Sequence, residues 1–171
     1  DNKKAEKFNK QYWNSYFDNS PEKAVNYLSS YEKGLIDNAP ITYVIVSDSL
    51  FKTQLQPFIR WKEQKGFNVI TAYTNDIGKT TSEIKSYLEN LYNNPNPTPP
   101  SFVLFVGDVG KVPAWNGNAG SHVTDLYYCE YTGDNLPEVY YGRFSAQTKD
   151  QLQPQIEKTL EYEKYKMSNP E

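Results

Sequence analysis

Three short runs of apolar residues place the tightest constraint on what this chain can fold into. They are Tyr43–Ser47, Phe67–Tyr73 and Ser101–Val106, and in the first and third the apolar residues follow one another without alternation. Strands of that kind are buried on both faces, which is typical of parallel sheets covered by helices. The runs therefore predict strands of a buried parallel sheet.

Two helical patterns separate these runs. Residues 54–65 place apolar side chains on one side and end at Gly66, a common helix stop. Thr80 and Glu83 form a capping box in front of a second amphipathic helix. The order is therefore β-α-β-α-β, with connections long enough for right-handed parallel crossovers. We predict an α/β fold with three layers, α/β/α, around a mainly parallel sheet.

The rest of the chain adds smaller elements at both ends. Tyr127–Tyr131 and Val139–Tyr141 read as two short strands joined by a turn, and a last helix runs from about Thr148 to Met167. Pro154 lies near the start of that helix and is expected to shift its beginning. Residues 1–40 contain an aromatic face at helical spacing and end in a Pro40 break, so we predict a helical arm, followed by a domain over 41–171.

Composition excludes several classes of function. The sequence contains 18 Lys and Arg and 21 Asp and Glu, which gives a net charge of −3, and no run of basic residues stands out. This disfavours nucleic-acid binding. No apolar run approaches the roughly 18–20 residues that a membrane-spanning helix needs, so we expect no membrane span. The sequence has one cysteine, which allows no internal disulfide.

Motifs for nucleophilic or nucleotide chemistry are missing. Cys129 and His122 are the only residues of their kinds. On an extended segment they would lie roughly 23 Å apart and face opposite sides, too far for a thiolate–imidazole pair. We expect a structural cysteine and a loop histidine, and no catalytic residue in this chain. Gly107–Lys111 lacks the spacing of a phosphate-binding loop, and no G-x-G-x-x-G follows the first strand.

Acidic residues follow two of the predicted strands. Asp48 comes after the first and Asp108 after the third, where ligands bind in open α/β sheets. The two acids could hold a metal ion, Asp108 could accept a phosphoryl group as in a receiver-like signalling domain, or each could cap the following helix or turn. The residues alone leave these alternatives open.

A second acidic feature predicts a calcium site. Asp134 and Glu138 lie at i and i+4 in a Gly- and Pro-containing turn. If that turn folds over the carboxyl edge of the sheet, it brings both carboxylates to Asp108, and calcium prefers such oxygen ligands. Backbone carbonyls complete the predicted set: Leu136, and either Tyr131 or Thr132. The alternative is that these acids are ordinary turn residues.

Five strings, in order along the chain, carry a family resemblance. They are Phe58–Phe67, Phe105–Asp108, Val123–Tyr128, Pro137–Ala146 and Leu160–Lys164. From about Tyr43 to Met167 the chain resembles the N-terminal part of the catalytic domain of gingipain-like cysteine peptidases. The strings at Trp61–Phe67 and Thr124–Tyr128 are most similar to the lysine-specific branch.

The resemblance implies a caspase-like catalytic domain of two α/β subdomains, of which this chain matches the first. The catalytic Cys, the catalytic His and its carboxylate belong to the second subdomain, beyond Glu171. The resemblance also implies a structural calcium ion on the Asp and on the Asp-x-x-x-Glu turn, here Asp108, Asp134 and Glu138. Residues 1–40 resemble the end of a pro-region, and the parent would be secreted or on the cell surface.

We therefore interpret the chain as the structural, calcium-binding part of a cysteine endopeptidase. Its partners would be the downstream catalytic subdomain of the same polypeptide and the protein or peptide substrates of the parent enzyme. The first alternative is a non-catalytic adhesion or secretion module of the same fold. A weaker alternative is the receiver-like signalling domain. Cleavage specificity does not follow from these residues.

Overall fold

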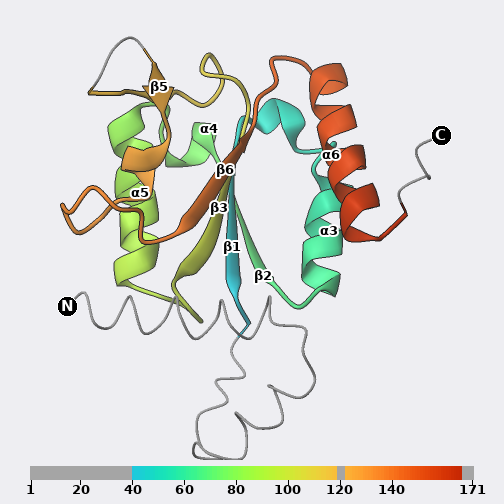
Figure 1. Ribbon diagram of the computed structural model, residues 1–171, viewed down its shortest axis with the longest axis horizontal. Helices are drawn as coiled ribbons and strands as arrows, with labels where there is room; N and C mark the ends of the chain where they lie inside the picture. Colours follow the sequence, from blue (N-terminus) through green and yellow to red (C-terminus); the bar gives the residue numbers. More distant parts are fainter. Residues whose placement is uncertain (1–39, 119–121, 167–171) are drawn as a thin grey trace, which may run out of the picture. The chain divides into compact units, whose positions relative to one another are not determined.

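All three predicted central strands are present and all are parallel. They are β1 (Thr42–Ser47), β2 (Asn68–Tyr73) and β3 (Pro100–Val106). A fourth strand, β6 (Tyr140–Phe144), pairs in parallel with β3 and completes a sheet of order β2-β1-β3-β6 (Figure 1). The crossovers from β1 to β2 and from β2 to β3 carry α-helices, whereas the connection from β3 to β6 is mostly irregular and is long enough for parallel pairing.

The computed structural model describes residues 40–118 and 122–166. The chain divides into two units, 1–39 and 40–171, and everything reported below belongs to the second. The predicted helical arm of residues 1–40 lies outside the described residues, apart from Pro40. Within the described part, no helix is long and apolar enough to cross a membrane.

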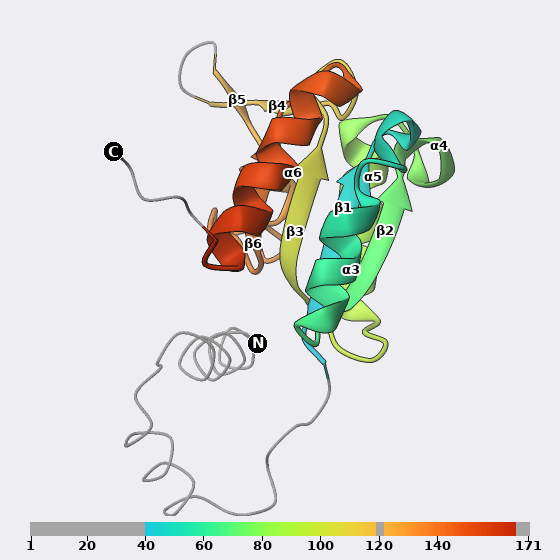
Figure 2. The ribbon, with the colours of Figure 1, turned by 90° about the vertical axis from the view of Figure 1, so that its right-hand side faces the viewer.

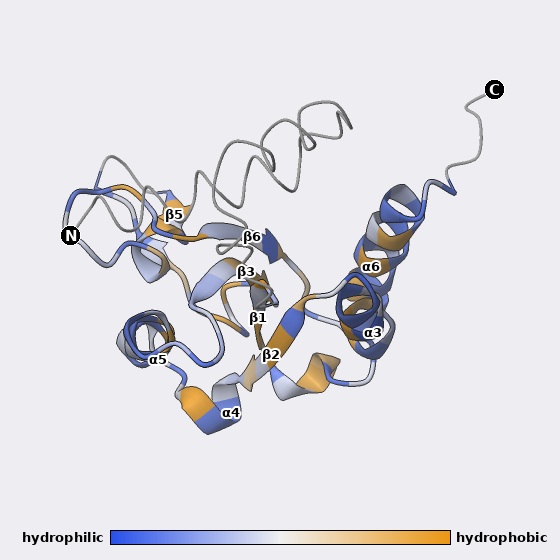
Figure 3. Cartoon of the chain, turned by 90° about the horizontal axis from the view of Figure 1, so that it is seen from below, coloured by the Kyte–Doolittle hydropathy of each residue, from blue (hydrophilic) through white to orange (hydrophobic). Residues whose placement is uncertain are grey.

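Helices cover both faces of the sheet. Figures 1, 2 and 3 place α3 (Gln56–Gln64) and α6 (Lys149–Glu163) on one face, and α4 (Thr74–Ile77) and α5 (Thr81–Asn93) on the other. This is the predicted α/β/α arrangement with a mainly parallel sheet. The predicted capping box is also confirmed, since Thr80 and Glu83 satisfy each other's backbone N–H groups at the start of α5.

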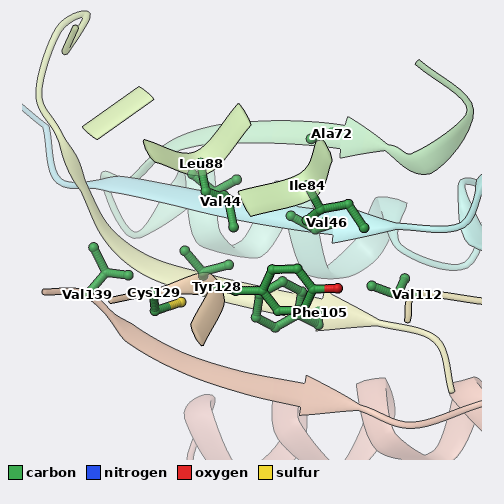
Figure 4. Close-up of a cluster of buried hydrophobic side chains, with 11 residues drawn as sticks. Val44, Val46, Ala72, Ile84, Leu88, Phe105, Val112, Tyr128, Cys129 and Val139 are labelled. Atoms are coloured by element: carbon green, nitrogen blue, oxygen red, sulfur yellow. The ribbon is translucent and has the colours of Figure 1, made fainter. Parts of the chain in front are cut away.

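Two apolar clusters hold the layers together, one on each face of the sheet. Alternate residues of β1 face opposite clusters: Val44 and Val46 pack with α5, and Ile45 packs with α3 and α6. Because both sets of side chains are fully buried, β1 shows no polar alternation in its sequence. Figure 4 shows the cluster under α5, in which Tyr128 and Cys129 lie beside Phe105.

The prediction of a strand over Tyr127–Tyr131 is wrong. Leu126–Tyr128 forms a single 3₁₀ turn, η2, which turns the Tyr128 side chain into the core. The Tyr128 ring packs on Phe105 at 4.8 Å between centroids, and its hydroxyl donates to the Pro113 carbonyl at 2.6 Å. Tertiary packing thus overrides the β propensity of a tyrosine-rich segment.

The second predicted short strand exists, but not in a hairpin. It begins at Tyr140 and pairs with β3 instead of with the preceding segment. A small antiparallel ribbon that the sequence did not predict, β4 (Trp115–Asn116) with β5 (Val123–Thr124), lies in the loop between β3 and β6.

The prediction that Pro154 shifts the start of the last helix is wrong. α6 begins at Lys149, and Thr148 and Gln151 form a capping box there. Pro154 lies inside the helix on its exposed side. The helix ends at Glu163.

Candidate functional site

The carboxyl edge of the sheet holds the two predicted acids, and both serve the local backbone. Asp48 Oδ1 accepts from the Leu50 N–H at 2.7 Å and caps the 3₁₀ turn η1 (Ser49–Phe51). Asp108 Oδ1 accepts from the Val109 N–H at 2.8 Å. Both carboxylates therefore accept from the backbone that follows them, as the capping alternative expects.

Asp108 also ties the end of β3 to the segment that follows β6. Its Oδ2 accepts from Gln147 Nε2 at 2.9 Å, and its Oδ1 accepts from the Ser145 hydroxyl at 3.2 Å. These hydrogen bonds, the one from Gln147 first, lower the pKa of Asp108, so the group is a carboxylate at neutral pH. In the described residues, no group of three or more His, Cys, Asp or Glu side chains could hold a metal ion.

The other predicted calcium ligands lie in the loop that precedes β6. The Glu138 carboxylate is buried and accepts from the Tyr131 N–H at 2.5 Å and the Thr132 hydroxyl at 2.6 Å. Asp134 Oδ1 accepts from the Leu136 N–H at 2.8 Å, and the Leu136 side chain is 65% exposed. The Glu138 contacts join the two ends of an exposed loop, and the Asp134 contact fixes the backbone at the tip of that loop.

The predicted convergence of Asp108 with Asp134 and Glu138 is wrong. Tyr140 at the start of β6 is level with Phe102 of β3, so residues before Tyr140 lie at the amino edge of the sheet. Asp108 follows β3 at the carboxyl edge, six residues beyond Phe102, or roughly 20 Å along the strand. The three acids therefore do not fit one ion, and any calcium binding by the loop alone stays a prediction.

Cys129 and His122 are not arranged for catalysis. The Cys129 side chain is fully buried between the sheet and α5, and this burial raises its pKa far above the ordinary thiol value. His122 is exposed at the start of β5, where its carbonyl accepts from the Gly117 N–H at 2.9 Å. A protonated, buried thiol without an imidazole partner is not a nucleophile.

Arg143 organises the carboxyl edge, and the sequence analysis did not identify this role. Its Nε and Nη2 donate to the two oxygens of Asp125 at 2.8 and 2.6 Å. Nη1 donates at 2.8 Å to the carbonyls of both Gly107 and Val112, and Nη2 reaches the Pro113 carbonyl at 3.4 Å. All five guanidinium N–H groups thus have acceptors, which fixes the loop after β3 onto β6.

A signal for this role was present in the sequence. Arg143 lies in a strand flanked by aromatic residues, and a mostly buried Arg needs a carboxylate partner. Which acid supplies it depends on the path of the chain, because Asp125 lies 18 residues away.

A second buried charge fastens α6 to α3. Lys62 is only 8% exposed, and its Nζ lies 5.0–5.5 Å from the ring centroids of Tyr43, Phe58 and Phe67. Its partner is Glu163, at 2.6 Å. The described residues therefore contain two mostly buried cation–carboxylate pairs, each of which joins elements distant in the sequence.

This fold is that of a known class of protein, the peptidases of the gingipain type. The model of peptidase family C25 matches residues 36–171, and the chain belongs to that family.

Known relatives agree with this assignment. Lys-gingipain from Porphyromonas gingivalis is 34% identical over 156 residues, which cover 89% of this chain and 9% of that protein. A solved structure described as "Structure of Protease" has a TM-score of 0.71 and 34% identity, and covers 81% of this chain and 30% of that one. The crystal structure of the Arg-specific cysteine proteinase gingipain R has a TM-score of 0.64 and 27% identity, and covers 77% of this chain and 30% of that one.

The caspase-like fold expected from the resemblance is confirmed by these structures. Family membership also favours the peptidase interpretation over a receiver-like domain. The chain spans much less than two thirds of the relatives that it matches.

Proposed function

We propose that this chain is the scaffold subdomain of a cysteine endopeptidase and that the catalytic Cys and His come from residues outside it. The observation that carries the proposal is the state of Cys129. A family of cysteine peptidases needs a reactive thiolate, and the only cysteine here is fully buried, with a raised pKa and no imidazole beside it. The nucleophile must then be supplied by another part of the parent protein.

The scaffold would act by holding loops in place. Arg143 fixes the loop after β3 at the carboxyl edge of the sheet, the edge at which α/β proteins present their ligand sites. A downstream catalytic subdomain would dock against such a prearranged surface, and precise placement of catalytic groups depends on rigid support.

The proposal extends to the parent enzyme. Its substrates would be proteins or peptides cleaved after Lys or Arg, in keeping with the names of the relatives, and it would act outside the cell or at its surface. Calcium belongs to the proposal only through the loop of Tyr131 to Glu138, because Asp108 lies at the opposite edge of the sheet.

The test is to express the chain together with about 200 residues that follow it in the parent gene, a typical domain length. Hydrolysis of Lys and Arg amide substrates is measured under reducing conditions. We expect activity that a downstream Cys→Ala change abolishes and that Cys129→Ala leaves intact. Circular dichroism of Cys129→Ala controls for folding. Loss of activity in a folded Cys129→Ala protein would contradict the proposal, and a following segment without Cys and His would favour a non-catalytic module.

A further inference from the structure

Basic residues are distributed unevenly along this chain. Residues 86–142 make up a third of the sequence, so an even spread would place about six of the 18 Lys and Arg there. The stretch contains one, Lys111. It also contains six of the 21 acidic residues, close to an even share. The depletion therefore concerns basic residues and not charged residues in general.

The depleted stretch includes the long irregular segment between β3 and β6. In its described part, regular structure is limited to the two-residue strands β4 and β5 and the single turn η2. Its tip, residues 132–137, is exposed at every position. Loop tips of this kind are the first places where proteases cut, because opening them locally costs little free energy.

In the part of the chain that the structure describes, the other basic residues lie mostly in regular structure or tight turns. Helices α3, α5 and α6 carry several of them, and Arg143 and Lys62 are held by buried ion pairs. The Lys79 N–H donates to Glu83 Oε2 at 3.0 Å beside the capping box of α5. Lys111 itself lies in a turn: its N–H donates to the Asp108 carbonyl at 2.7 Å, and buried Val112 follows it.

We propose that the part of the loop between β3 and β6 that follows Lys111 gives the parent enzyme resistance to its own activity, because residues 112–139 expose backbone without a Lys or Arg to a peptidase specific for them. This inference rests on the proposed function and takes from it the preference for basic residues. The exposed backbone of the loop is accessible to a peptidase. Only the absence of Lys and Arg side chains protects it from one that requires them. A single basic residue placed at its tip should therefore make it a cleavage site.

The test is limited proteolysis of the 171-residue chain with trypsin, with the cut bonds identified by mass spectrometry. Asp134→Lys adds a site at an exposed position, and Asp134→Gln is the matched control, because both changes remove the carboxylate that accepts from the Leu136 N–H. We expect Asp134→Lys to be cut between residues 134 and 135 roughly tenfold faster than any bond within α3 or α5, since cutting a helix requires unfolding it. Wild type and Asp134→Gln should remain uncut from residue 112 to residue 142.

Two further measurements make the result decisive. An Asp/Glu-specific peptidase should cut the wild-type loop after Asp134, which shows directly that the loop is accessible. Equal thermal midpoints for the two variants show that unfolding does not cause the difference. If Asp134→Lys is as resistant as wild type at this bond, the fold itself protects the loop and the inference is overturned. That failure is distinct from failure of the proposed function, which depends on thiol-dependent activity of the longer protein.

Discussion

The buried pair of Lys62 and Glu163 predicts an unequal response to losing each partner. In the described residues, Glu163 is the only carboxylate within salt-bridge distance of Lys62, at 2.6 Å. Glu163 has two further donors, Trp61 Nε1 at 2.9 Å and Lys65 Nζ at 3.4 Å. Removing the acid therefore leaves a buried ammonium without an opposite charge, whereas removing the lysine leaves a carboxylate that is still paired.

The expected magnitudes follow from that difference. Breaking a buried pair by removing one partner costs about 3–5 kcal/mol, and because the Glu163 side chain is 17% exposed we expect about 2–4 kcal/mol for Glu163→Gln. Lys62→Met places an apolar chain of similar length among Tyr43, Phe58 and Phe67 and should cost about 1 kcal/mol or less. The double variant should cost about as much as Lys62→Met, so the coupling free energy should equal in magnitude the cost of Glu163→Gln alone, about 2–4 kcal/mol.

The assay is urea denaturation of the four proteins at pH 7, repeated at lower pH. Burial alone would raise the pKa of Glu163, but the hydrogen bonds and charges of Lys62, Trp61 and Lys65 outweigh it and lower the pKa below its ordinary 4.5. A carboxyl with a lowered folded-state pKa adds stability above pH 4.5 and loses it as the pH falls through the folded-state pKa.

The difference in unfolding free energy between wild type and Glu163→Gln should therefore shrink in acid. Lys62→Met costing as much as Glu163→Gln, or strict additivity in the double variant, would refute the reasoning.

Three other predictions follow from the fold. The isolated chain should not hydrolyse Lys or Arg amides, and Cys129 should resist alkylation by iodoacetamide at pH 8 until the protein is unfolded, since burial raises its pKa; rapid labelling of the folded chain would contradict this. Leu104→Ala should cost about 2–5 kcal/mol in chemical denaturation, because Leu104 is buried in the central strand β3, and a loss below about 1 kcal/mol would be inconsistent with that position. If calcium raises the thermal midpoint through the loop before β6, Asp134→Asn should remove the increase and Asp108→Asn should retain it; a wild-type midpoint that responds to neither calcium nor chelator would exclude the loop site.

The layers of the fold could be predicted because each depends on a local pattern. The unbroken apolar run of β1 is explained by residues that alternate between two buried clusters, with Val46 on one side and Ile45 on the other. The start of α5 is explained by two side chains, Thr80 and Glu83, three residues apart. Such features need no knowledge of distant contacts.

The polar contacts that fix the loops could not be predicted in the same way. Arg143 and Asp125 are joined across 18 residues, and Lys62 and Glu163 across 101. Nothing near Arg143 in the sequence distinguishes Asp125 from the other acids that follow β3. The pairing is decided only when β6 takes its place beside β3, because that step brings the guanidinium under the carbonyls of Gly107 and Val112.

The direction of β6 also explains why Asp108 does not converge with Asp134 and Glu138. Two tyrosine-rich segments with a Gly- and Pro-containing turn between them resemble a hairpin, and a hairpin after β3 would keep that turn near Asp108. Buried Tyr128 removes the first segment from the sheet, so the second is free to pair with β3 in parallel. A parallel strand must enter from the amino edge, and the loop of Asp134 and Glu138 is thereby carried to the end of the sheet opposite Asp108. The burial of Tyr128 thus places the predicted ligands Asp134 and Glu138 about one strand length from Asp108. At the carboxyl edge, the polar contacts are instead those of Arg143, which fixes the loop after β3.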